Sequence, residues 1–195
     1  GFTLTNTSKS TSLISGGATL TLINGNVVYN DLSNGSTATA MQVQSGSTLT
    51  LNSVKLSTNC TGLMALGNAA TLNVINSTVT GETYAIGTNA GDEANYNVKI
   101  TLQGSEISVT GADNCAILFN VPGQLNIDGC TINGTRQGVI VRAGTAYIQN
   151  SNIRATDAWA STDEYITSGW SEGNVCTAGA LVFGNYQTNK TAYKS

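Results

Sequence analysis

Apolar residues recur along this chain in a fixed three-member pattern. Two of them stand two positions apart, and a third follows five positions after the second. The first members of successive copies lie 21 to 29 residues apart, so spacing is constant within the pattern and variable between copies. This is typical of a repeat protein with rigid strands and variable loops. The six copies are Leu20, Leu22 and Val27; Leu49, Leu51 and Leu56; Leu72, Val74 and Val79; Ile100, Leu102 and Ile107; Leu125, Ile127 and Ile132; and Ala146, Ile148 and Ile153.

Each copy predicts two short strands, B and C, separated by a tight bend. Alternation of apolar and small polar residues, together with β-branched enrichment, favours strand over helix. Residues 2–5 and 12–15 predict strands C and A of an incomplete first coil. A third strand, A, follows a variable loop after each strand C, in the segments MQVQ (41–44), GLMAL (62–66), TYAIG (83–87), CAILF (115–119), GVIVR (138–142) and GALVFG (179–184).

The constant strand order predicts an all-β solenoid. An antiparallel sandwich would need strands that fold back through regularly spaced two-residue turns, whereas here the same three-strand order repeats. Each strand is therefore expected to stack on its own copy one coil later, which gives three parallel sheets. One inward column is expected to contain Leu22, Leu51, Val74, Leu102, Ile127 and Ile148.

The second position of the bend between strands B and C is always a small residue or asparagine. Such residues tolerate the left-handed backbone of a sharp corner. Stacked asparagine side chains could also hydrogen-bond along the column, although turn chemistry alone explains the pattern. The six residues are Asn24, Ser53, Asn76, Gly104, Gly129 and Asn150.

Composition narrows the class of protein. The repeat covers nearly all 195 residues, so we expect one domain over 1–195. Charged residues make up 10 % of the chain and the net charge is −3, with no basic stripe, which argues against nucleic acid and anionic membrane as partners. No apolar run is long enough to predict membrane insertion. The low-charge composition, rich in Ser, Thr and Asn, favours an extracellular or cell-surface location.

The four cysteines are Cys60, Cys115, Cys130 and Cys176. Cys60, Cys115 and Cys176 are expected to occupy the same register, just before strand A, but in alternate copies. Alternate copies would lie roughly 10 Å apart if coils stack at about 4.8 Å. Disulfides need Cα atoms about 4.4 to 6.8 Å apart. We therefore expect mostly free, buried thiols, with disulfides as the alternative because extracellular proteins often pair their cysteines.

The coil length, the three strands per coil, the apolar columns and the asparagine corners resemble the right-handed parallel β-helix of the pectin-lyase-like superfamily. The repeat is also similar to that of large bacterial surface adhesins. The resemblance covers about residues 12–184 and implies a right-handed β-helix of about six to seven coils. It implies less about function, because this scaffold carries many activities. Neither end shows a capping helix, so we expect the chain to be a segment of a longer protein.

Enzymes of that superfamily generally use acidic and basic residues gathered in a groove along the sheets. Strand A offers only Arg142, at its edge, and strand C offers Lys55, Glu106 and Arg154 on separate coils. No catalytic residue is predicted on the strands.

The longest insertion, residues 155–175, is the main candidate for a binding site. Its aromatic rings could stack on sugar rings while its carboxylates accept hydroxyl hydrogen bonds. A hydrophobic lid over the last coil is the favoured interpretation and the ligand site the alternative, since large aromatic residues are more often packed than presented. The candidate ligand-binding residues are Asp157, Trp159, Asp163, Glu164, Tyr165 and Trp170.

A second acidic loop contains Asp92 and Glu93, with Asn89 and Asn95 nearby. Calcium needs six to eight oxygen ligands, and this spacing matches no defined calcium loop, so a solvated turn is favoured over a calcium site. No metal ligand or cofactor is predicted.

These observations predict a non-catalytic extracellular β-helix segment of a bacterial surface protein, which acts in adhesion to a glycan or host protein or as a structural stalk. One alternative is a polysaccharide lyase or glycoside hydrolase with a loop-borne site at Asp157, Asp163, Glu164 or Arg142. Another is a fragment similar to a phage tail spike, which would form a trimer.

Overall fold

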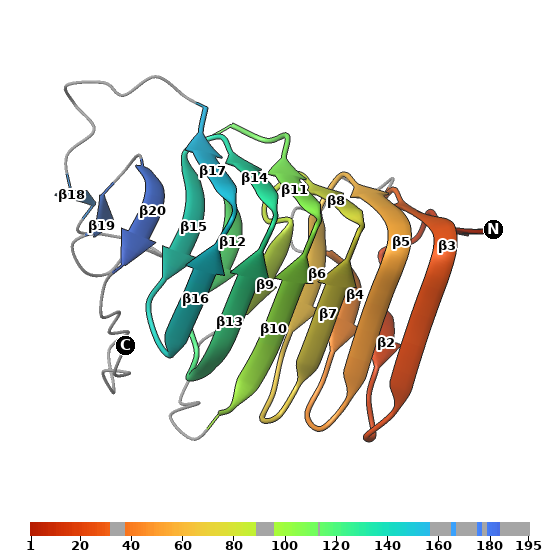
Figure 1. Ribbon diagram of the computed structural model, residues 1–195. Coiled ribbons are helices and arrows are strands. Elements are labelled where there is room, and N and C mark those ends of the chain that lie inside the picture. The colour runs from red at the N-terminus through yellow and green to blue at the C-terminus, as the bar shows by residue number, and fades with distance from the viewer. Residues whose placement is uncertain are drawn as a thin grey trace.

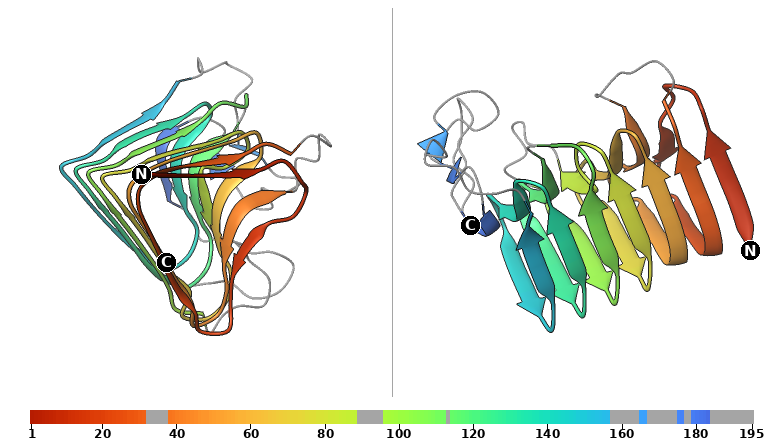
Figure 2. Two further views of the ribbon diagram at one scale, coloured as in Figure 1. Left: turned by 90° about the vertical axis from the view of Figure 1, so that its right-hand side faces the viewer. Right: turned by 90° about the horizontal axis from the view of Figure 1, so that it is seen from above.

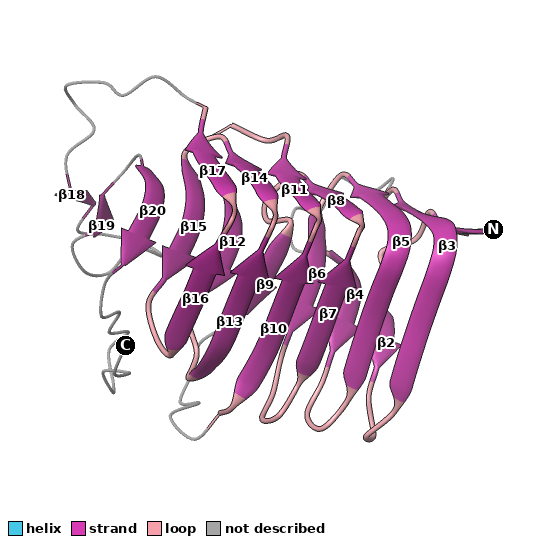
Figure 3. Ribbon diagram, viewed as in Figure 1, coloured by secondary structure: helices cyan, strands magenta, loops and turns pink. Residues whose placement is uncertain are grey.

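The computed structural model describes residues 1–31, 38–88, 96–112, 114–156, 165–166, 175–176 and 179–183, with the two short segments 165–166 and 175–176 described by their backbone alone. Every regular element in these ranges is a β-strand (Figure 3). The strands wind into a solenoid of about six coils, so the predicted fold class is confirmed (Figure 1).

The strands predicted as A form one parallel seven-stranded sheet. The register follows the coil order, with Leu63 opposite Ile86 and Ile86 opposite Ile117. The strands are β2 (Ser12–Ile14), β4 (Thr39–Val43), β6 (Thr61–Ala65), β9 (Ile86–Thr88), β12 (Cys115–Phe119), β15 (Gln137–Val141) and β20 (Gly179–Phe183).

Strands B and C share a second parallel sheet, so the expectation of a separate sheet for each of the three strand types is wrong. The two are joined because the two longest strands continue through the corner without a break. These are β3 (Thr19–Tyr29) and β5 (Thr48–Thr58). Strand B continues as β7 (Thr71–Ile75), β10 (Val98–Gln103), β13 (Gly123–Asp128) and β16 (Thr145–Gln149); strand C comprises β1 (Phe2–Asn6), β8 (Thr78–Gly81), β11 (Glu106–Val109), β14 (Thr131–Gly134) and β17 (Asn152–Ala155).

The bounds of the A strands agree with the prediction to within two residues, except at the start of one strand. The segment TYAIG was expected to pair over 83–87, whereas β9 begins at Ile86. Only residues 82–85 connect β8 to β9, and the backbone is still turning through them. Ala85 nevertheless donates its N–H to the carbonyl of Ala116 at 3.1 Å, so the coil stays in register.

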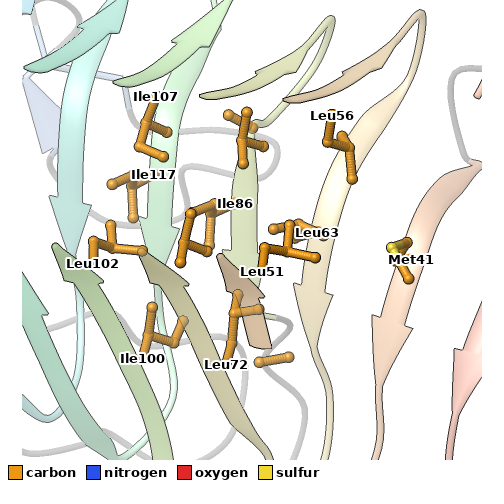
Figure 4. Packing of buried hydrophobic residues seen from close by; sticks show 14 of the residues in the cluster. Met41, Leu51, Leu56, Leu63, Leu72, Ile86, Ile100, Leu102, Ile107 and Ile117 are labelled. Carbon is orange, nitrogen blue, oxygen red and sulfur yellow. The ribbon is translucent and has the colours of Figure 1, made fainter. Parts of the chain in front are cut away.

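The predicted inward column is confirmed residue by residue. Leu51 lies between Leu22 and Val74 in the register, and the series continues through the later coils to Ile148. Viewed along the axis, the coils lie over one another around a single interior (Figure 2). Aliphatic side chains from all three strand types meet there (Figure 4). Burying one such side chain contributes about 1.5–3 kcal/mol, so these columns are the main source of stability.

The predicted corner geometry is also confirmed. All six residues at the second bend position have positive φ, from 46° at Asn76 to 64° at Gly129. The residue that follows each of these positions adds side-chain hydrogen bonds between neighbouring corners. The hydroxyl of Ser105 accepts the N–H of Ser77 at 3.1 Å and donates to the carbonyl of Gln103 at 2.8 Å. The hydroxyl of Ser77 in turn accepts the N–H of Val54 at 3.0 Å.

This corner ladder, defined as Val54, Ser77, Ser105, Cys130 and Ser151, was not predicted from the sequence. Cys130 takes a serine's place in it: its Sγ lies 3.4 Å from the carbonyl of Asp128, and its N–H donates to Ser151 at 3.0 Å. The buried corner N–H groups of Val54, Ser77 and Cys130 thus each have an acceptor, which such a group needs.

Cys60, Cys115 and Cys130 are free and buried, as expected. Burial raises the pKa of all three thiols. The expectation that Cys60 and Cys115 share a register is wrong, because the column through Leu63 and Ile117 places Cys60 one position earlier. Cys60 therefore packs in the main core and Cys115 in a separate cluster with Leu118 and Ile140. The side chain of Cys176 lies outside the description.

Candidate functional site

The structure does not test the loop residues chosen from the sequence. Tyr165 is described only by its backbone, in β18 (Tyr165–Ile166), which pairs antiparallel with β19 (Val175–Cys176). Outside the described residues lie Asp157, Trp159, Asp163, Glu164 and Trp170, and also Asn89, Asp92, Glu93 and Asn95 of the second acidic loop.

The charged residues of strand C are placed as expected. Lys55 and Glu106 occupy the same outward column with Thr78 between them, so they lie two coils apart. Arg154 lies on β17, where its Nε donates to the side chain of Asn152 at 3.2 Å.

Arg142, the basic residue of strand A, immediately follows β15 as predicted. Its backbone N–H donates to the carbonyl of Phe119 at 2.8 Å. The residue is only 2 % exposed, so its guanidinium is not presented to solvent. This burial argues against Arg142 as an open catalytic base in the enzymatic alternative.

The described surface contains a shallow groove of about 400 Å³, which we call the strand-C groove. It crosses four consecutive coils where strand C ends and the chain turns toward strand A. Its lining residues are Val28, Tyr29 and Asn30; Ser57, Thr58 and Asn59; Thr80 and Glu82; and Thr110.

Two of the groove residues are held by hydrogen bonds. The Asn59 side-chain amide accepts the N–H of Asp31 and donates to its carbonyl, both at 2.9 Å, which ties two successive coils together. The Thr58 hydroxyl accepts the N–H of Cys60 at 3.1 Å. These side chains form a fixed part of the groove wall.

Three other groove side chains are available to a ligand. Within the described part of the chain, the side chains of Asn30, Ser57 and Glu82 make no hydrogen bond. Asn30 and Glu82 are exposed and Ser57 is half-buried. Together they offer an amide, a hydroxyl and a carboxylate on three successive coils.

A second cavity, of about 310 Å³, lies beside the first coil. It is lined mostly by apolar residues, among them Leu4, Val27 and Met41. Tyr29 lines both cavities; it is 2 % exposed, and its hydroxyl has no hydrogen-bond partner among the described residues. Burial is the main reason that the pKa of Tyr29 is raised.

Sequence reasoning missed the strand-C groove, although a signal was present. Asn30, Asn59, Glu82 and Thr110 each stand three positions after the last member of the apolar pattern in the first four copies. Residues at the same place in successive copies lie side by side once the coils stack. If polar residues at equivalent positions of successive copies had been compared, as the apolar residues were, these four residues would have been predicted to line one wall.

Among the described residues no group of three or more His, Cys, Asp or Glu side chains is placed to hold a metal ion. That part of the chain also contains no helix of the length and apolarity needed to cross a membrane. No family model matches the sequence, and no match was found among curated proteins or solved structures.

Proposed function

We propose that this chain is a non-catalytic, extracellular β-helix segment of a bacterial surface protein. In this proposal it belongs to the pectin-lyase-like superfamily and acts in adhesion to a glycan or host protein, or as a structural stalk. Residues 155–175 remain candidates for ligand contact within it, chiefly Asp157, Trp159, Asp163, Glu164, Tyr165 and Trp170.

The observation that carries the proposal is the chemistry of the outward columns. On strand B one such column runs through Thr21, Thr50, Asn73, Thr101 and Asn126. On strand C, Ser57, Thr80, Ser108 and Asn133 form another. Repeated uncharged hydroxyl and amide groups on a rigid rod give a surface on which many weak contacts can add together.

Binding without turnover tests the proposal. The purified chain would be applied to an array of glycans and to immobilised host surface proteins, and incubated with a panel of polyuronates. We expect binding to at least one probe and no release of unsaturated or reducing sugars. Sugar release would overturn the non-catalytic assignment in favour of a lyase or hydrolase. Absence of binding would remove adhesion and leave only the stalk.

A further inference from the structure

The strand-C groove runs along the axis of the solenoid rather than along a strand. Its lining comes from the ends of β3, β5 and β8 and from Thr110, which follows β11. Neighbouring parallel strands lie about 4.8 Å apart, so equivalent side chains recur at that interval along the groove. An extended ligand lying in it would meet a similar wall at each coil.

The backbone in this region is not available to a ligand. Strand β5 is paired with β3 on one side and with β8 on the other, and β8 is paired in turn with β11. A peptide that binds by adding a strand needs a free edge. Recognition in the groove must therefore rely on side chains.

The available side chains suit sugar hydroxyl groups. The Asn30 amide both donates and accepts hydrogen bonds, the Ser57 hydroxyl does the same, and the Glu82 carboxylate is a strong acceptor. Val28, which is 38 % exposed, adds an apolar patch against which the C–H face of a sugar ring can pack. A few placed polar groups around an apolar patch are the usual composition of a small-ligand site.

The charge of the groove favours an uncharged ligand over an acidic one. Glu82 is the only side chain among the nine described lining residues that is charged at neutral pH, and none of these nine is a cation. An acidic polysaccharide would place its carboxylates against this carboxylate without compensation. An uncharged ligand avoids that cost and can donate its hydroxyls to Glu82.

We infer that the strand-C groove binds an uncharged oligosaccharide, extended along the solenoid axis, through Asn30, Ser57 and Glu82. This inference rests on the proposed function and gives it a site and a ligand class. None of its described lining residues belongs to a strand A. Thr110 borders it on the fourth coil, and Asn59 keeps its wall in place.

The test uses the whole chain and two substitutions of equal charge. Ser57→Arg places a long side chain in the groove. Position 57 belongs to an outward column of strand C that already contains an arginine, Arg154, on a later coil. Thr131→Arg is the matched control, because it lies on an exposed outward position of β14 outside the groove, in register with Glu106. Circular dichroism and thermal melting would establish that both variants fold.

Binding would be measured on uncharged and acidic oligosaccharide arrays and then by titration with the tightest uncharged oligosaccharide. We expect the wild type and Thr131→Arg to bind it equally and Ser57→Arg to bind at least about tenfold more weakly. Glu82→Gln, which removes a charged acceptor that no described residue uses, should also weaken binding by about tenfold. This variant keeps the test decisive if Ser57→Arg does not fold.

The remaining outcomes separate the site from the function. Equal binding by the wild type and all three variants would contradict the inference that the ligand binds in the strand-C groove, but it would not contradict the proposed adhesion function. Binding only to acidic glycans or to host proteins would overturn the ligand class in the same way. Sugar release, or no binding by the wild type to any probe, would remove both the groove inference and adhesion.

Discussion

The corner between strands B and C and the connection from strand C to strand A are built in opposite ways. Where strands B and C are separate elements, two residues always join them, and the first has a left-handed backbone. The connection from C to A varies from two residues, as at 59–60, to 23 residues, as at 156–178, where it includes β18 and β19. The corner thus fixes the coil geometry, whereas the other connection can change length and composition. The strand-C groove lies at the start of this variable connection, where strand C ends.

The largest expected effect comes from changing the length of the corner. A glycine inserted between Asn76 and Ser77 would shift β8 by one residue, so that Val79, now 0 % exposed, would exchange faces with Thr80. We expect the free energy of unfolding to fall by at least about 3 kcal/mol, or the chain not to fold, because the inward column is broken at mid-length. Urea unfolding followed by circular dichroism measures this loss.

The matched control is the same glycine inserted between Gly111 and Ala112, in the connection from strand C to strand A. Lengthening a surface loop costs only about 0.6 kcal/mol per doubling of its length, so a loss below about 1 kcal/mol is expected. Similar losses from the two insertions would contradict the contrast between corner and connection.

A smaller loss is expected from the corner ladder. Ser105→Ala removes the acceptor of the Ser77 N–H and leaves a buried donor without a partner, which costs about 1–3 kcal/mol. Ser105→Cys should cost less, because Cys130 already fills the same place on the next coil. Urea titration of the two variants provides the comparison, and an alanine variant as stable as the wild type would show that the ladder contributes nothing.

The apolar pattern was sufficient to predict the fold because one set of residues determines both the strands and their stacking. A β-strand alternates its faces with a period of two, so the pair Leu20 and Leu22 had to point inward together. The positive φ at Asn24 followed from the need for a corner before Val27. The residue preferences of strands and corners and the order in which the strands stack therefore predicted the same fold.

The polar contacts were harder to predict, because they depend on which residues the coils bring together. The hydrogen bond from Ser77 to Ser105 joins residues 28 positions apart. The groove is lined by Asn30 on the first of its four coils and by Thr110 on the fourth, and neither residue belongs to a distinctive sequence motif. Cys60 and Cys115 show the same limit, since a shift of one residue assigned them to different clusters.

A change of backbone preference at the corner gives the next effect. Gly129 has φ of 64°, and a Cβ atom there would make only ordinary van der Waals contact, the nearest atom lying 3.8 Å away. Gly129→Val should lower the free energy of unfolding by about 1–2 kcal/mol, because a branched side chain disfavours the left-handed region. Gly129→Asn should be nearly neutral, since asparagine occupies this column at Asn24, Asn76 and Asn150. Thermal unfolding of the pair measures the difference, and equal stability would mean that the corner does not constrain its residue type.

The smallest effect concerns a hydrogen bond between corners on the surface. The Asn150 side chain donates to Oδ1 of Asp128 at 3.0 Å and, with a second contribution from Gln149, lowers the pKa of that carboxyl. Because the folded-state pKa is lowered, this contribution is present at neutral pH and is lost as pH falls through the titration of Asp128. Asn150→Ala should raise the pKa of Asp128 toward the ordinary aspartate value of about 4, with little change in melting temperature because the carboxyl is well solvated. Titration of the Asp128 carboxyl by NMR checks the shift, and Gln149→Ala serves as the comparison with a smaller expected change. An unchanged pKa of Asp128 in Asn150→Ala would mean that the Asn150 side chain does not stabilise the carboxylate. Asn150 would then contribute to the corner only through its left-handed backbone conformation, which all six corner residues share.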